Sequence, residues 1–194
     1  MSESEVFILA DQTLAEVIDH ILPHQWDNIV SAEITPRQPG SSLRQIINYH
    51  AYDNAWVPEV LAGKTVEQVG DKYDGDQLGD DPALSYRHLS ELARTAVAKA
   101  DLERTVHLSY GDFPAREYLM HITSFRTLRA YDIAKFIGVD STLPPELVQG
   151  FWDELQPVAE EWRKMGVYGP EVEVPVGADL QSRLLGLTGR DPSA

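Results

Sequence analysis

PAREYLMHITSFRTLRAYDIAKFIG, residues 114–138, predicts a single helix that is long enough to cross a whole domain. Pro114 suits the first helical turn, where its missing N–H is no loss, and Gly138 accepts the left-handed conformation that ends many helices. At about 1.5 Å per residue the segment spans roughly 35 Å, the diameter of a small domain. One broad face repeats at intervals of three and four residues and carries Tyr118, His121, Ile122, Phe125, Leu128 and Asp132. A face of this kind needs partner helices.

Helical periodicity recurs on both sides of this segment. The expected helices cover residues 4–22, 43–61, 83–99, 145–164 and 180–187. Pro157 should kink or split the fourth of these, because an interior proline removes a backbone hydrogen bond. A loop is predicted over 31–40, a turn at SYGDFP (109–114), and short extended pieces at 102–108 and in the tail. The chain, 1–194, is therefore expected to form one all-α domain, a helical bundle with ligand sites between facing helices.

Charge and cysteine content narrow the classes of partner. The 31 acidic residues outnumber the 16 basic ones and give a formal charge of −15, which disfavours nucleic acid and anionic membranes as partners. The absence of cysteine excludes disulfides and leaves histidine and carboxylates as the strong metal ligands. The start, MSESEVFILADQ, lacks the basic and apolar regions of a leader, and no stretch approaches the roughly 18 apolar residues of a membrane span. A soluble, cytoplasmic protein is expected.

Titratable groups on apolar faces are the candidates for chemistry, since a buried charge needs a partner. In the second helix His50 lies in the apolar stripe, and Asp53, three residues later, shares its face. The two form either a structural hydrogen bond or a ligand with the group that orients it. His121 and Asp132 on the long helix are likewise either satisfied core groups or parts of a site. The acidic stretch 64–82 is predicted to be a surface loop, which either covers a cleft or keeps the protein soluble.

Four segments carry a resemblance to a known family. They are LRQIINYHAYDNAWVPEVLAG (43–63), LSYGDFPAREYL (108–119), LRAYDIAKFIG (128–138) and EVEVPVGADLQSRLLGLTGRDP (171–192). In these segments the chain resembles the DinB-like superfamily, and within it the branch of the mycothiol-dependent maleylpyruvate isomerase N-terminal domain. The resemblance covers nearly the whole length. It implies a four-helix bundle with an extra C-terminal helix and a short extended segment, and relatives of this kind often pair as homodimers.

The resemblance also implies a zinc or nickel ion held by three residues at the centre of the bundle. One ligand is the histidine of the second helix, His50 here, and two more come from a motif like E-x-x-x-H-x-W-D-L-A on the long helix. Matching that motif to residues 131–134 puts Arg129 and Phe125 at the other two ligand positions. Phe125 has no lone pair, and a guanidinium only donates hydrogen bonds. The family metal site is therefore expected to be lost, with Arg129 in place of the metal and salt-bridged to Asp53.

Three functions remain open on these grounds. The first is a small-molecule-binding bundle without a cofactor, which holds an anionic ligand on Arg129 in a central cleft. That cleft would be lined by His50, Asp53, Trp56, Phe125, Arg129 and Tyr131. The second is a divalent-metal-dependent isomerase or transferase that uses a mycothiol-type thiol. Its zinc or nickel would be held by a rebuilt set of His50, His121 and Asp132. The third is a structural or regulatory homodimer without a small-molecule site.

Overall fold

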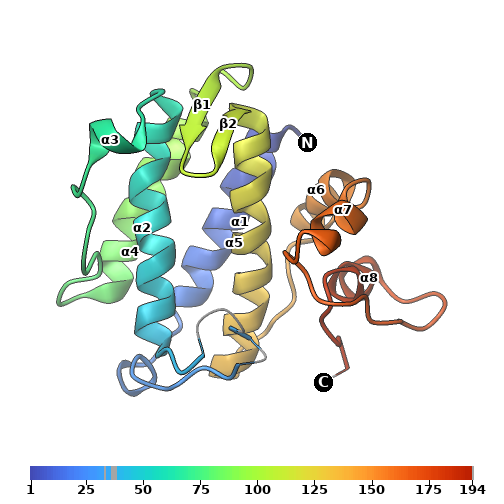
Figure 1. Cartoon of the computed structure of the whole chain (residues 1–194). Coiled ribbons are helices and arrows are strands. Elements are labelled where there is room, and N and C mark those ends of the chain that lie inside the picture. The colour runs from blue at the N-terminus through green and yellow to red at the C-terminus, as the bar shows by residue number, and fades with distance from the viewer. Residues whose placement is uncertain (33, 36–38, 194) are drawn as a thin grey trace.

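Four long helices lie side by side and form the larger part of the molecule (Figure 1). The computed structural model describes residues 1–32, 34–35 and 39–193. The four helices are α1 (Glu3–Ile18), α2 (Leu43–Leu61), α4 (Pro82–Val97) and α5 (Ala115–Ile137). α1 packs against both α4 and α5, and α2 packs against α4. The chain is thus mainly helical, as the periodicity predicts.

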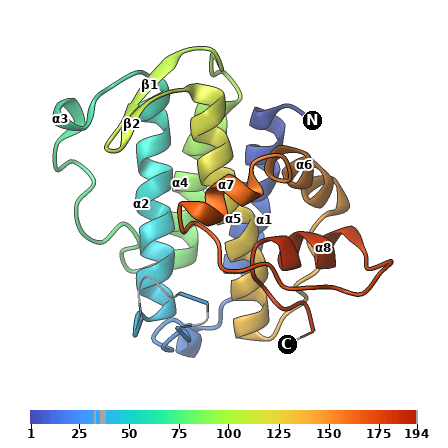
Figure 2. The same cartoon turned by 45° about the vertical axis from the view of Figure 1, so that its right-hand side comes forward.

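Shorter elements surround these helices. They are the 3₁₀ turn η1 (Pro23–Gln25), α3 (Val66–Val69), β1 (Thr105–Leu108), β2 (Gly111–Pro114), α6 (Pro145–Leu155), α7 (Ala159–Lys164) and α8 (Leu180–Leu187). β1 and β2 pair as an antiparallel hairpin at the start of α5, with Val106 opposite Phe113. α6 contacts α1, α5 and α8, so the C-terminal helices lie on the side of α5 that faces away from α2 (Figures 1 and 2).

The limits of the long helix agree with the sequence prediction. Pro114 is the N-cap, and Gly138 ends the helix with a left-handed φ of 78°, a conformation that a side chain would strain. α2 begins after Ser42, whose hydroxyl accepts a hydrogen bond from the Gln45 N–H and satisfies a free donor of the first turn. Pro157 separates α6 from α7, as expected of an interior proline.

Two sequence predictions need correction, and a third concerns residues that the structure describes only in part. The expected turn at 109–114 contains the second strand of the hairpin, because Gly111 allows a tight reversal at φ 142° and returns the chain along β1. The extended piece in the tail forms no strand in the described residues, although the Val172 N–H donates to the Gly186 carbonyl. The predicted loop over 31–40 falls partly outside the described residues.

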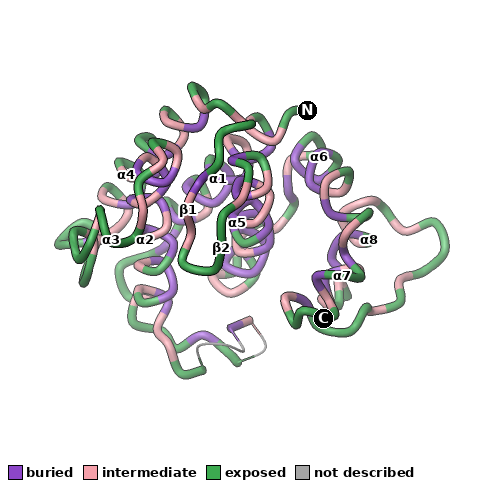
Figure 3. The backbone as a smooth tube through the Cα atoms, turned by 45° about the horizontal axis from the view of Figure 1, so that its top comes forward, coloured by how far each residue is buried: buried purple, intermediate pink, exposed green. Residues whose placement is uncertain are grey.

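The long helices carry buried residues along the stretches that face one another, drawn in purple in Figure 3. Phe125, predicted to lie on the buried face of α5, is 41% exposed, whereas the next residue, Arg126, is fully buried. The buried face of α5 is therefore turned toward Arg126 relative to the predicted apolar stripe. Phe125 lies at the edge of this buried face. Among the described residues no helix combines the length and apolar character that crossing a bilayer requires.

Candidate functional site

The structure brings His50 of α2 and Arg129 of α5 together at the place where the family resemblance expects a metal. Arg129 Nε donates to His50 Nε2 at 3.3 Å, and Arg129 Nη1 donates to the Ile34 carbonyl at 3.1 Å. Burial, and then the charges of Arg129 and Arg126, holds the pKa of His50 well below its usual range. His50 is therefore neutral, and its ring accepts the hydrogen bond from Arg129 through Nε2.

Asp132, one turn beyond Arg129, is bound to the C-terminal segment. Arg190 Nε and Nη2 donate to the two carboxylate oxygens of Asp132, each at 2.9 Å, in the bidentate geometry that suits a guanidinium. Arg129 lies 3.8 Å from the same carboxylate. Asp132 therefore has a structural role, with the guanidinium groups of Arg190 and Arg129 beside it. Its carboxylate also balances the charge of Arg129.

Asp53 is not the partner of Arg129, contrary to the sequence prediction. Among the described residues Asp53 forms no ion pair, because it lies one turn along α2 from His50, and Arg129 extends to His50 and Ile34 instead. Burial raises the pKa of Asp53 to about 6, and the charge of Arg126 offsets part of that rise.

The proposed rebuilt metal set of His50, His121 and Asp132 is also not assembled. No group of three or more potential ligands is found among the described residues. His121 and Asp132 are eleven positions apart on α5, which corresponds to about 16 Å along the helix axis. His121 instead lies among the rings of Tyr110, Phe113 and Trp162.

The six residues predicted to line one central cleft do not share it. Phe125 lines one cavity and Tyr131 another, because residues six positions apart on a helix point in directions that differ by about 120°. Trp56 packs against Tyr52 and Tyr73, on the side of α2 that carries the acidic segment.

The acidic segment 64–82 is tied to α2. Lys72 and Tyr73 both donate to the Glu59 carboxylate, at 2.6 Å and 3.0 Å. Hydrogen bonds from Lys64 and Lys72 lower the pKa of Glu59 to about 2. Figure 1 shows the segment on the far side of the molecule from α6, α7 and α8. The segment therefore does not cover any cleft between these three helices and α5.

A buried polar network that the sequence did not predict joins all four long helices. Its members, here called the Arg126 network, are Asp11 of α1, Asn54 of α2, Ser90 of α4 and Arg126 of α5, each fully buried. Asp11 accepts hydrogen bonds from Arg126 Nε at 3.1 Å, from Asn54 Nδ2 at 3.0 Å and from the Ser90 hydroxyl. Arg126 also donates to the side-chain amide oxygen Oδ1 of Asn54 and, at 3.1 Å, to the backbone carbonyl of Ile122. The charges of Arg126 and Asp11 are paired within the network, so we assign it a structural role.

A sequence signal for this network exists. Arg126 lies four residues after Ile122 and four before Ala130, so it interrupts an apolar row of α5. Asp11 interrupts the corresponding row of α1 between Phe7 and Leu14. Opposite charges that each break an apolar face are expected to pair inside the fold.

A cavity of about 950 Å³ lies between the hairpin, α5 and the α6–α7 region. We call it the aromatic–carboxylate cavity. Its aromatic wall consists of Tyr110, Phe113, Phe125 and Trp162, and its carboxylates are those of Glu3, Glu117, Glu154 and Glu161. Tyr110, Phe125 and Met165 are large apolar residues that are 61%, 41% and 61% exposed, and all three line this cavity. A concave apolar surface with a few polar groups is the usual form of a ligand site.

Glu154 is the polar group of this cavity with the most unusual surroundings. Both of its carboxylate oxygens are buried without a hydrogen-bond partner. Burial, followed by the charge of Glu3, raises its pKa to about 7. The hydrogen-bonding capacity of this carboxyl group is unused, and a turn of the side chain toward the cavity would present it to a ligand.

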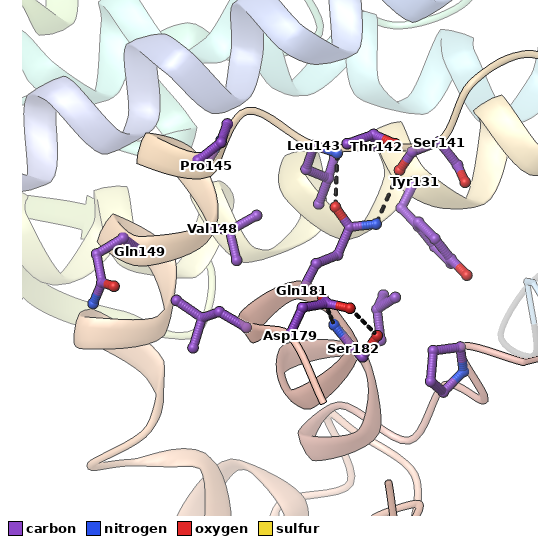
Figure 4. A pocket seen from close by; sticks show the side chains of 13 residues that line it. Tyr131, Ser141, Thr142, Leu143, Pro145, Val148, Gln149, Asp179, Gln181 and Ser182 are labelled. Atoms are coloured by element: carbon purple, nitrogen blue, oxygen red, sulfur yellow. Dashed lines mark hydrogen bonds between the residues drawn. The ribbon is translucent and has the colours of Figure 1, made fainter. Parts of the chain in front are cut away.

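A second cavity, of about 510 Å³, lies between α5, α6 and α8 (Figure 4). Its polar groups are already engaged. The Gln181 side chain accepts from the Leu143 N–H at 2.8 Å and donates to the Ser141 carbonyl at 3.2 Å, and Asp179 caps α8 through Ser182. This cavity is therefore the weaker candidate.

Comparison of the chain with protein-family models, with curated proteins and with solved structures finds no match. The function must therefore follow from the side chains themselves. Among the features described, the aromatic–carboxylate cavity combines a ligand-sized volume with polar groups that have no protein partner.

Proposed function

We propose that the protein binds a small molecule in the aromatic–carboxylate cavity, on a DinB-like four-helix bundle made by α1, α2, α4 and α5. The free carboxylate of Glu154 in a cavity of about 950 Å³ is the observation that carries this function. The hydrogen bonds between Asp132 and Arg190 support the DinB-like assignment, because they join two of the segments on which the resemblance rests. α8 is then the extra C-terminal helix.

A resident zinc or nickel ion does not fit the centre of this bundle. His50 Nε2 already accepts from Arg129, and neither Arg129 nor Phe125 has a lone pair to offer. Arg129 supplies a fixed positive charge there, which opposes a divalent cation. Binding without a metal is thus favoured over metal-dependent thiol chemistry.

The DinB-like assignment predicts that the metal site can be restored. Phe125→Glu combined with Arg129→His places a carboxylate and a histidine one turn apart on α5, with the histidine at the position whose side chain contacts His50. We expect this double variant to hold about one Zn²⁺ per chain, measured by elemental analysis after gel filtration, whereas the wild-type chain retains none in stoichiometric amount.

His50→Ala in the background of the double variant is the control, and it should remove the bound zinc. A folded double variant that takes up no zinc would contradict the matching of α5 to the family motif.

The cavity is tested by a fragment screen that uses ligand-observed NMR and thermal shift. We expect hits whose affinity falls about tenfold in Phe125→Ala, because the ligand loses the apolar surface of that ring. Leu92→Ala on α4 is the matched control: it truncates an apolar residue of similar exposure, 46% against 41%, away from the cavity. Hits that bind both variants equally, or an absence of hits on the folded protein, would refute a ligand site here.

A further inference from the structure

The aromatic–carboxylate cavity carries an excess of negative charge. None of the carboxylates of Glu3, Glu117, Glu154 and Glu161 pairs with a lysine or arginine within 4 Å in the part of the chain that the structure describes. The lining contains one guanidinium, that of Arg116, and it is already paired with Glu103. His121 lies 4.0 Å from Glu117, but burial lowers the pKa of its ring, so it is neutral at pH 7. The cavity therefore attracts cations and repels anions.

The rings of the wall are suited to the same kind of ligand. Tyr110 and Phe113 have ring centroids 5.5 Å apart, and both surround His121, which is 5.5 Å from Trp162. Phe125 is exposed beside them. The face of an aromatic ring attracts a cation most strongly when the cation has left bulk water, as in a partly closed cavity. An inorganic ion does not use such rings, whereas an alkylated ammonium group does.

We infer that the ligand of this cavity is an organic cation, an amine or a quaternary ammonium compound, held by the Glu154 carboxylate and the surrounding rings. This inference rests on the proposed function and adds the charge of the ligand to it. The aromatic wall takes the alkyl groups of the cation, and the carboxylates balance its charge. The ligand thus differs in sign from the anion that the sequence suggested for Arg129.

Choline and its uncharged isostere, 3,3-dimethylbutan-1-ol, are the probes that separate charge from shape. We expect choline to bind about tenfold more tightly, measured by NMR titration of the Trp162 indole N–H. Glu154→Gln should remove most of this preference. Glu146→Gln on the same helix, at an exposed position outside the cavity, is the control and should leave it unchanged.

The affinity for choline is also expected to depend on pH. Choline keeps its charge at all pH values, whereas Glu154, whose pKa is raised to about 7, is charged above that pH and neutral below it. Choline should therefore bind several-fold more tightly at pH 8 than at pH 6. The other charged or titratable groups around Glu154 are the N-terminal ammonium, Glu3, Arg116, Glu117, His121 and Glu161. The pH dependence should therefore be lost in Glu154→Gln, which leaves these groups in place.

The possible outcomes separate this inference from the proposed function. Equal affinity for choline and its isostere, or a preference for the isostere, would overturn the choice of a cation while the cavity remained a ligand site. A choline preference that persists in Glu154→Gln would overturn the role of Glu154. Failure of choline to bind a protein that takes up neutral or anionic fragments would overturn the inference alone. Failure of every fragment would overturn both.

Discussion

Arg126→Met is expected to lower the free energy of unfolding by about 3–5 kcal/mol, the largest effect of any single substitution considered. Arg126 and Asp11 are both fully buried, and Arg126 Nε lies 3.1 Å from the Asp11 carboxylate. Removal of the guanidinium leaves that carboxylate inside the protein with Asn54, Ser90 and the more distant Arg94, whose Nε is 3.6 Å away. Urea denaturation followed by circular dichroism measures the change.

Two further variants make this expectation specific. Arg87→Met removes one partner of an ion pair at the surface, between Arg87 and Asp19, and should change stability little, because solvent screens such pairs. Asp11→Asn added to Arg126→Met removes the stranded charge and should recover part of the loss. Similar effects of Arg126→Met and Arg87→Met, or no recovery in the double variant, would contradict the role given to the buried pair.

Arg190→Ala is expected to lower the free energy of unfolding by about 2 kcal/mol and to loosen the C-terminal segment. The effect is smaller than that of Arg126→Met because Asp132 keeps Arg129 at 3.8 Å. The loss should appear as faster amide hydrogen exchange in α8, whose Thr188 carbonyl also accepts from Arg190 at 3.4 Å.

Asp191→Asn is the matched control for that experiment. Asp191 neighbours Arg190 and accepts hydrogen bonds from the exposed Ser193, so its replacement should leave both stability and exchange unchanged. If Arg190→Ala behaved like Asp191→Asn, the pair with Asp132 would contribute nothing measurable to the docking of the segment.

Several helix ends could be predicted because they depend on local chemistry, although α1 ends at Ile18 and not at the predicted residue 22. Pro114, Gly138 and Pro157 act through their own backbone geometry and their nearest neighbours, and the structure places each at the expected boundary. The hairpin was missed in part, because each of its strands has only four residues and the second strand shows no clear alternation.

The candidate site was less accessible to sequence reasoning. The proximity of Arg129 to His50 followed from matching two motifs, whereas the choice of Asp53 as its partner assumed an orientation of α2 that periodicity does not define. The aromatic–carboxylate cavity joins residues 3, 110–125 and 154–167, and their meeting depends on how α6 and α7 return to α5. Such long-range packing leaves no pattern in a single segment.

The Arg126 network has a consequence for the order in which the chain assembles. Arg126 is 115 residues from Asp11, so the pair forms only when α5 joins the helices that precede it. An intermediate made of α1, α2 and α4 would enclose the Asp11 carboxylate before its guanidinium arrives. In such an intermediate the carboxylate would have only the more distant Arg94 of α4, 3.6 Å away, so retained water would be favoured, since a charge without a close counter-ion is costly to dehydrate. Expulsion of this water is thus expected to accompany the docking of α5, as a late step of folding.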